Sequence, residues 1–342
     1  MTPAKQHSSV RQAKTLDVGI EITNGGAVVR MLARTTAGIF RHSARIAQPA
    51  MPATVIDSIN SLIASARNQH RASSDAPLSI GGIGVAIWGQ VAAADDATQE
   101  GVVVRMRHSH LWEHVLLGKM LSERWQCPVT VQAAASAAAI AESELLDETE
   151  SAALLYLLPE RDLPAVMVYN GTPDRAVASD PARFGHWPTG GKRICSCGAR
   201  GHLQAVASAQ AIVRNFIGLA STREADYDAM MRGSGGRAEA ITAASVAALA
   251  AQGNPSASTV MGDAISALAP ILTGLATWYD ARSIAIGGIL ADSEDGFVAP
   301  LREAVAAGMG NSRAPVRVRG GRAGPAAVVY GALRLGEAAA GD

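Results

Sequence analysis

Four residues that bind transition metals lie between positions 186 and 202 of a chain that has only three cysteines. They are His186, Cys195, Cys197 and His202. Two thiolates and two imidazoles suit tetrahedral zinc, and the neighbouring glycines allow the backbone to turn tightly around one point. The alternative is a loop in which reduced cysteines and histidines merely lie close in sequence, and the Cys-x-Cys spacing argues against it. Because four protein ligands fill a tetrahedral shell, we expect a structural zinc rather than a catalytic one.

Length and charge bound the class of protein. With 342 residues, 48% of them hydrophobic, the chain can form two domains with substantial cores. Thirty basic residues balance thirty acidic ones, so we expect no direct binding of nucleic acid and no attraction to anionic lipid. The apolar runs, such as 243–251, are too short to cross a bilayer, and no secretory segment precedes the first strand. These features predict a soluble cytoplasmic protein.

Hydrophobic periodicity predicts alternating strands and helices. Alternation at 16–22 and 27–33 predicts two strands that form a hairpin, and 80–87, 129–131 and 283–286 are typical of further strands. Helical spacing is found at 55–67, 116–125 and 326–340. Residues 1–14 are polar and aperiodic, which predicts a disordered tail. The alternation favours an α/β fold.

The zinc segment also carries a family resemblance. Phe184-Gly185-His186, the run Cys-x-Cys-Gly-x-x-Gly from Cys195, and Leu203 to Ser208 resemble the signature of the repressor, open-reading-frame, kinase (ROK) family of sugar kinases and regulators. In that family three cysteines and one histidine bind zinc. Here His202 stands at the third cysteine, and zinc accepts either ligand.

Other segments extend this resemblance from about residue 15 to the C-terminus. They are Ile83-Gly84-Val85, Trp88-Gly89, Ala135 to Glu142, and Ile284 to Gly288. The resemblance implies a two-domain actin-like ATPase or sugar-kinase fold, related to ribonuclease H, with a zinc-binding loop. We expect a smaller domain formed by 15–132 and 325–342, and a larger one formed by 133–324 that carries the zinc loop. The family also implies a homodimer.

The catalytic positions of the family are changed. The resemblance places the family's Asn-Asp pair, whose carboxylate deprotonates the sugar hydroxyl, at Ala133 and Ala134. A methyl group cannot act as a base, and general-base assistance is worth roughly a hundred- to ten-thousand-fold in rate. We therefore expect no catalytic residue at this position.

The phosphate-binding turns are degenerate as well. In the first turn Thr23-Asn24-Gly25 stands where Gly-Gly-Thr would be expected, so the side chains of Thr23 and Asn24 lie where bare backbone should approach the phosphate. A shifted register that uses Asp17 and Gly19 is an alternative, and Glu21 could hold magnesium through water. The second turn aligns with 160–165, which has no glycine, a proline and two acidic side chains. Only Gly287 and Gly288 are retained, so binding of ATP and magnesium is not expected.

The sugar-binding positions differ too. The resemblance places two sugar-binding glutamates of the family at Arg183 and Gln204, while His186 is kept and Ser136 is a further candidate ligand contact. An arginine favours an anionic ligand, such as a sugar phosphate or sugar acid, because its planar fork matches carboxylate and phosphate. The alternative is a surface arginine paired with a nearby acid.

Two further clusters have ordinary interpretations. His108, His110 and His114 could suggest a second metal site, but a solvated loop that leads into a helix is the simpler interpretation. The arginines at 313–322 lack aromatic partners, and 315–319 is typical of a short strand with exposed arginines.

These observations lead to three hypotheses. The first is a catalytically inactive ROK protein that senses a sugar or sugar derivative, or contacts a protein partner, as a regulator without its own helix-turn-helix. We expect the short tail before Leu16 to be too short for a helix-turn-helix domain. The second is an active ATP-dependent kinase of glucose or amino sugars that uses displaced groups. The third is a ligand-free scaffold.

Overall fold

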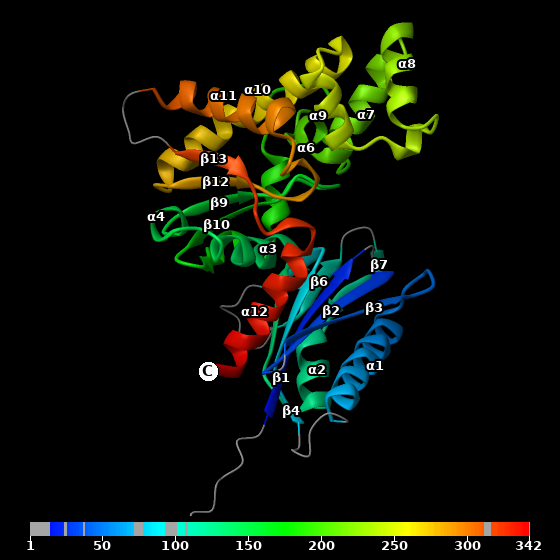
Figure 1. Cartoon of the computed structure of the whole chain (residues 1–342), viewed down its shortest axis with the longest axis vertical. Helices are drawn as coiled ribbons and strands as arrows, with labels where there is room; N and C mark the ends of the chain where they lie inside the picture. Colours follow the sequence, from blue (N-terminus) through cyan, green and yellow to red (C-terminus); the bar gives the residue numbers. More distant parts are fainter. Residues whose placement is uncertain are drawn as a thin grey trace, which may run out of the picture. The chain divides into compact units, whose positions relative to one another are not determined.

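A computed structural model describes residues 14–23, 26–36, 38–71, 78–92, 101–106, 109–310 and 316–341 of the chain. It has an α/β architecture made of two compact units (Figure 1). Unit 1 comprises the described residues within Met1–Ala92, Thr98–Gln132 and Ala332–Asp342, and unit 2 those within Ala133–Gly331. Asn24, His108, Arg313 and all but the last residue of the expected tail lie outside the described residues.

A five-stranded sheet with the order β3-β2-β1-β4-β8 forms unit 1. The strands are β1 (Lys14–Thr23), β2 (Val28–Thr35), β3 (Gly38–Arg45), β4 (Leu78–Ile87) and β8 (Val129–Ala133). β1 pairs antiparallel with β2 and parallel with β4. The alternating residues of β1 all point into one core, because Leu16, Val18, Ile20 and Ile22 are fully buried.

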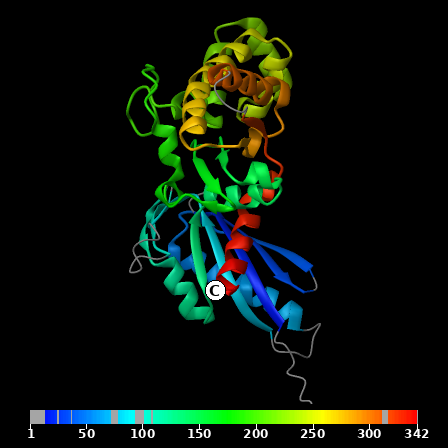
Figure 2. The ribbon, with the colours of Figure 1, turned by 90° about the vertical axis from the view of Figure 1, so that its left-hand side faces the viewer.

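Helices pack against both faces of this sheet. On the face of the alternating apolar residues lie α1 (Pro52–Arg71) and α2 (Leu117–Trp125), which share their hydrophobic core. On the opposite face lies α12 (Ala327–Gly341), seen in red in Figure 2. A Cβ at Gly84 would collide with the carbonyl of Ala332 on α12, so glycine permits this close approach.

The histidine segment adopts a different structure from the one expected. Ser109–Val115 is a strand, β7, in a small antiparallel sheet with β5 (Gly89–Val91) and β6 (Val103–Met106). The expectation of a loop leading into a helix is therefore wrong for 109–115, because pairing with β6 extends this segment. Trp112 anchors the strand, since its buried Nε1–H donates to the carbonyl of Ala50 (3.0 Å), while His110 and His114 are exposed.

Unit 2 has a second five-stranded sheet, with the order β11-β10-β9-β12-β13. The strands are β9 (Leu154–Leu157), β10 (Ala165–Tyr169), β11 (Thr172–Pro173), β12 (Ser283–Ile286) and β13 (Arg317–Gly320). β12 is parallel to β9 and β13, and β10 is antiparallel to β9. In Figure 1, α3 (Ala134–Ser143) lies on one side of this sheet, and α10 (Pro255–Trp278) and α11 (Ala299–Met309) lie on the other.

Short helices complete unit 2. They are α4 (Glu148–Ser151), α5 (Arg175–Ala178), η2 (Pro181–His186), α6 (Gln204–Ala207), α7 (Ala209–Ala220), α8 (Glu224–Gly233), η3 (Ala238–Ala240), α9 (Ala243–Ala251), η4 (Gly288–Leu290), η5 (Glu294–Val298) and η6 (Gly324–Ala326). Among the described residues only α10 is long and apolar enough to cross a membrane by length and composition. Core helices of globular domains pass the same test, and ten residues of α10, including Leu268 and Leu272, are buried inside unit 2.

Candidate functional site

The loop between η2 and α6 folds back on itself and brings its polar side chains to one place. Two isolated bridges, Pro188 with His202 and Ile194 with Arg200, hold its two sides together. Gly198 (φ +89°) and Gly201 (φ +74°) take left-handed conformations that residues with a Cβ adopt only under strain. We call residues 186–202 the metal loop.

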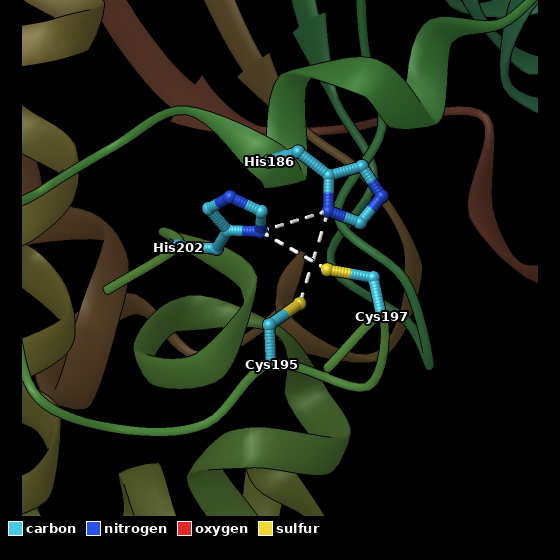
Figure 3. Close-up of side chains that lie close together, drawn as sticks. All are labelled: His186, Cys195, Cys197 and His202. Atoms are coloured by element: carbon cyan, nitrogen blue, oxygen red, sulfur yellow. Dashed lines mark hydrogen bonds between the residues drawn. The ribbon is translucent and has the colours of Figure 1, made fainter. Parts of the chain in front are cut away.

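The four predicted ligands converge within this loop. His186 ends η2, the two cysteines lie near the tip of the loop, and His202 comes just before α6, yet one ligand atom of each lies within 4.8 Å of the others. Figure 3 shows the four side chains directed toward a common centre. The Nδ1 atoms of His186 and His202 are 3.2 Å apart. The Sγ of Cys195 is 3.8 Å from the first, and the Sγ of Cys197 is 3.2 Å from the second.

These separations match the edges of a zinc tetrahedron. Zn–N bonds of about 2.0 Å and Zn–S bonds of about 2.3 Å place two nitrogens about 3.3 Å apart, and nitrogen and sulfur about 3.6 Å apart. Both imidazoles face the centre with Nδ1, so both can offer a lone pair while Nε2 carries the proton. The donor set therefore fits zinc, and two thiolates would balance its charge.

Burial disfavours the thiolate form of one of the two cysteines. Cys195 is 3% exposed whereas Cys197 is exposed. Burial is the largest cause that raises the pKa of the Cys195 thiol. A metal ion counteracts that effect because it binds the thiolate directly and displaces the proton.

Polar contacts fix the metal loop to the helices of unit 2. The guanidinium of Arg193 donates to Asn215 Oδ1 on α7 (3.0 Å) and contacts Asp263 on α10 (3.4 Å). Asn215 in turn donates to the carbonyl of Ala205 on α6 (3.2 Å). The loop is thus anchored beside the cluster by contacts that do not involve the four ligands.

Gln204 joins the metal loop to the loop between β9 and β10. It is 4% exposed, and its Nε2 donates to Asp162 Oδ1 (3.0 Å) and to Ser196 Oγ (2.9 Å). Ser196 lies between the two cysteines, and Asp162 lies in residues 158–164, which we call the β9–β10 loop. Both amide hydrogens are used in these contacts, while Oε1 has no hydrogen-bond partner among the described residues.

The expected base position carries no acid–base group. Ala134 is the first residue of α3 and is 2% exposed, and Ala133 is equally buried. Ser136, two residues further, is fully buried and donates to the carbonyl of Ala178 (3.0 Å). The hydroxyl of Ser136 is thereby committed to a contact within unit 2.

Internal contacts also engage the carboxylate at the first phosphate turn. Glu21 is 2% exposed; its Oε1 accepts from Trp88 Nε1 (3.2 Å), and its Oε2 accepts from Arg30 (3.2 Å). Thr23 is the last residue of β1. A magnesium ion at Glu21 would have to compete with both donors.

Side chains surround the two retained glycines, Gly287 and Gly288. A Cβ at Gly287 would collide with the hydroxyl of Tyr156, and a Cβ at Gly288 with a carboxylate oxygen of Glu160. Burial raises the pKa of Tyr156, and the nearby Glu142 and Glu160 raise it further. The backbone at Gly287 and Gly288 therefore faces a phenol and a carboxylate.

Arg183 lines a cavity that none of the other expected ligand contacts lines. It is exposed and lines a cavity of about 220 Å³ together with Asp180, Trp187 and Tyr279. His186, Gln204 and Ser136 do not line that cavity, although a Cβ at Gly185 would contact Gln204. The structure thus brings the four metal ligands together, and places Arg183 at a separate, largely apolar cavity.

Unit 2 also has a larger groove, which the sequence did not predict. It measures about 560 Å³ and is lined by residues of the β9–β10 loop, α7, the start of α9 and η4, among them Arg161, Gln210, Arg214, Thr242 and Ile289. These residues are scattered and form no motif. Its size lies in the range of pockets that hold small molecules.

Comparisons with known proteins agree on the fold. The model of the ROK family matches residues 18–338. A ROK family glucokinase from Streptomyces griseus, solved with glucose and AMPPNP, is 21% identical with a TM-score of 0.72, over 94% of this chain and 99% of that one. ROK hexokinase from Thermus thermophilus is 20% identical with a TM-score of 0.69, over 95% and 98%.

Regulators share the same fold. A ROK family transcriptional regulator, a homolog of the E. coli MLC protein, is 19% identical with a TM-score of 0.69, over 94% of this chain and 78% of that one. No curated protein matches the sequence. Kinases and regulators are thus both structural neighbours of this chain.

Proposed function

The chain belongs to the ROK family, and we propose that it is a catalytically inactive member that carries a structural zinc and binds a ligand or a protein partner. The observation that carries this proposal is the buried pair Ala133 and Ala134 at the start of α3. A sugar hydroxyl needs a base at that point of the fold, and no atom of an alanine side chain accepts a proton.

The surroundings of the glycines support the same conclusion. Phosphate sites of this kind use bare backbone N–H groups, whereas Gly288 faces the carboxylate of Glu160. A carboxylate repels a triphosphate, and the same loop contains Pro164, which has no N–H to donate. Weak binding of ATP and magnesium follows from both features.

In this proposal the zinc has a structural role and takes no part in catalysis. Four protein ligands leave no open position for substrate or water. Zinc would fix the metal loop, and through Ser196 and Gln204 it would also steady the β9–β10 loop. We propose a cytoplasmic homodimer that acts as a sensor of a sugar or sugar derivative, in the manner of the regulators in the family.

The decisive experiment is a calorimetric titration of the zinc-loaded protein with magnesium ATP. It is run alone and with glucose, N-acetyl amino sugars or sugar phosphates, alongside an assay of ADP release. We expect a Kd for magnesium ATP above about 1 mM, and no sugar-dependent release of ADP. Micromolar binding of ATP with turnover of any sugar would refute the proposal, provided that the variant Arg161→Gln weakens both and thereby excludes a contaminating kinase.

The second candidate is an active ATP-dependent sugar kinase. The groove of about 560 Å³ favours it, since Arg161 and Arg214 supply positive charge beside the carboxylate of Glu160, and apolar residues such as Ile289 suit a nucleobase. The glucokinase neighbour was solved with glucose and AMPPNP. This candidate requires a displaced carboxylate as base, and it predicts the positive outcome of the titration above. Silence toward every ligand would instead favour the third candidate, a ligand-free scaffold.

A further inference from the structure

The cavity beside Arg183 is a site of its own in unit 2. Its floor is formed by Leu155 on β9 and by Ala165 and Met167 on β10, which are 3%, 7% and 3% exposed. The last turn of α10 with Tyr279 after it, and η2 with Trp187, also line the cavity. None of the four metal ligands lines this cavity, and it shares no lining residue with the larger groove of about 560 Å³.

The size of this cavity suits one aromatic ring. An apolar cavity of about 150 Å³ inside a protein binds benzene and stays free of water. The present cavity of about 220 Å³ leaves room for a ring and one substituent, and is smaller than the roughly 300 Å³ of pockets for larger ligands.

The lining selects the chemistry of the ring and of its substituent. All of the lining residues except Asp180 and Arg183 are apolar or aromatic, so a sugar would leave most of its hydroxyls without partners. Trp187 is 43% exposed, which places its indole at the mouth, where it can stack on a ring.

The two charged residues have different roles. Asp180 is 4% exposed and already has a partner within the protein. Arg183 is exposed and forms no ion pair with any other residue of the described ranges. A guanidinium at the mouth of an apolar cavity matches a carboxylate at the edge of a bound ring, because its fork can donate two parallel hydrogen bonds.

We propose that this cavity binds a small aromatic carboxylate, with the ring on Leu155, Ala165 and Met167 and the carboxylate on Arg183. The site does not depend on the proposed loss of phosphoryl transfer, since none of its residues belongs to the metal cluster, the start of α3 or the β9–β10 loop. An active kinase could carry it equally well.

Calorimetry with benzoate tests this site on the zinc-loaded full chain. Benzamide serves as the neutral ring, and acetate as the charge without a ring. We expect a Kd for benzoate of about 1 mM or below, and affinities at least about tenfold weaker for benzamide and acetate, since a charge-assisted pair contributes about one power of ten.

Variants separate the ring from the charge. Arg183→Gln should weaken benzoate at least about tenfold and leave benzamide unchanged, whereas Arg232→Gln, an exposed arginine on α8, should change neither. Ala165→Leu should abolish both by filling the floor, and Leu275→Trp narrows the cavity from the wall in case the first variant fails to fold. Zinc content and the melting temperature report folding.

Three results would overturn the proposal. The first is absence of benzoate binding at about 10 mM. The second is equal benzoate affinity of the wild type and Arg183→Gln. The third is a wild-type dimer that does not bind benzoate and that dissociates in the variant Trp187→Ala. This result would mean that a second copy of the chain covers the cavity.

Discussion

Two loops of unit 2 that meet at Gln204 differ in what they offer to a ligand. In the metal loop, the ligand set is complete although His202 stands at a cysteine position of the family. In the β9–β10 loop, no residue is a glycine, and Glu160 approaches the backbone at Gly288. A site built from side chains tolerates exchange of one donor for another, whereas a site built from bare backbone N–H groups is lost when a side chain fills the space.

The largest effect should come from the metal ligands. Cys195→Ser should release zinc and lower the free energy of unfolding by more than about 3 kcal/mol, because no residue of the metal loop belongs to the hydrophobic core of unit 2. Zinc content by atomic absorption and the melting temperature measure both effects.

Cys127→Ser is the matched control and should keep its zinc. Burial raises the pKa of Cys127 to about 11, so this thiol should resist alkylation at pH 8, while chelation should expose the other two. A Cys195→Ser protein with full zinc content would contradict the assignment of this ligand.

A smaller effect is expected where the two loops meet. Gln204→Glu removes the donor to Asp162 and places two carboxylates side by side, which should cost about 1–3 kcal/mol of stability without loss of zinc. Chemical denaturation measures the change, and Gln252→Glu at an exposed position should be nearly neutral. An unchanged Gln204→Glu protein would mean that the two loops are independent.

The pH dependence of stability tests whether the Tyr156 phenol is buried beside Gly287 and Gly288. Burial, Glu142 and Glu160 raise its pKa, so the unfolded chain loses this proton first as pH rises. Stability from this group is therefore complete below about pH 10 and is lost above it. Tyr156→Phe should remove that alkaline loss, and should change the free energy of unfolding at neutral pH by only about 1 kcal/mol.

Denaturation curves between neutral and alkaline pH show this difference. Tyr227→Phe, at an exposed position, should follow the wild type over the same range. Parallel alkaline losses in Tyr156→Phe and the wild type would argue against the buried position of the phenol.

The smallest effect is expected for His202→Cys. This change restores the third cysteine of the family, so zinc should stay bound and the free energy of unfolding should shift by less than about 1 kcal/mol. Metal content and thermal unfolding check it, with His202→Ala as the variant that should lose zinc. Loss of zinc in His202→Cys would mean that the loop geometry is specific for an imidazole at this position.

The sequence predicted much of the secondary structure, since the spacing of apolar residues records which side of an element is buried. The alternation at 16–22 lies within β1, and the helical spacing at 55–67 lies within α1. The segment 109–115 escaped prediction because its strand depends on pairing with β6. The cavity beside Arg183 escaped too, because its floor comes from β9 and β10 and one wall from α10.

The sequence by itself determined which chemical groups this protein has: a set of four metal ligands, and alanines at positions 133 and 134, where the family resemblance places a base. The chemistry of a side chain belongs to the residue itself, so it needs no fold to be recognised. Only the tertiary structure decided which groups meet. Gln204 contacts Asp162 across 42 positions, and Arg183 borders an apolar cavity rather than the other expected ligand contacts. Packing of distant segments brings such partners together, and its driving force is the total apolar area buried, which no local pattern records.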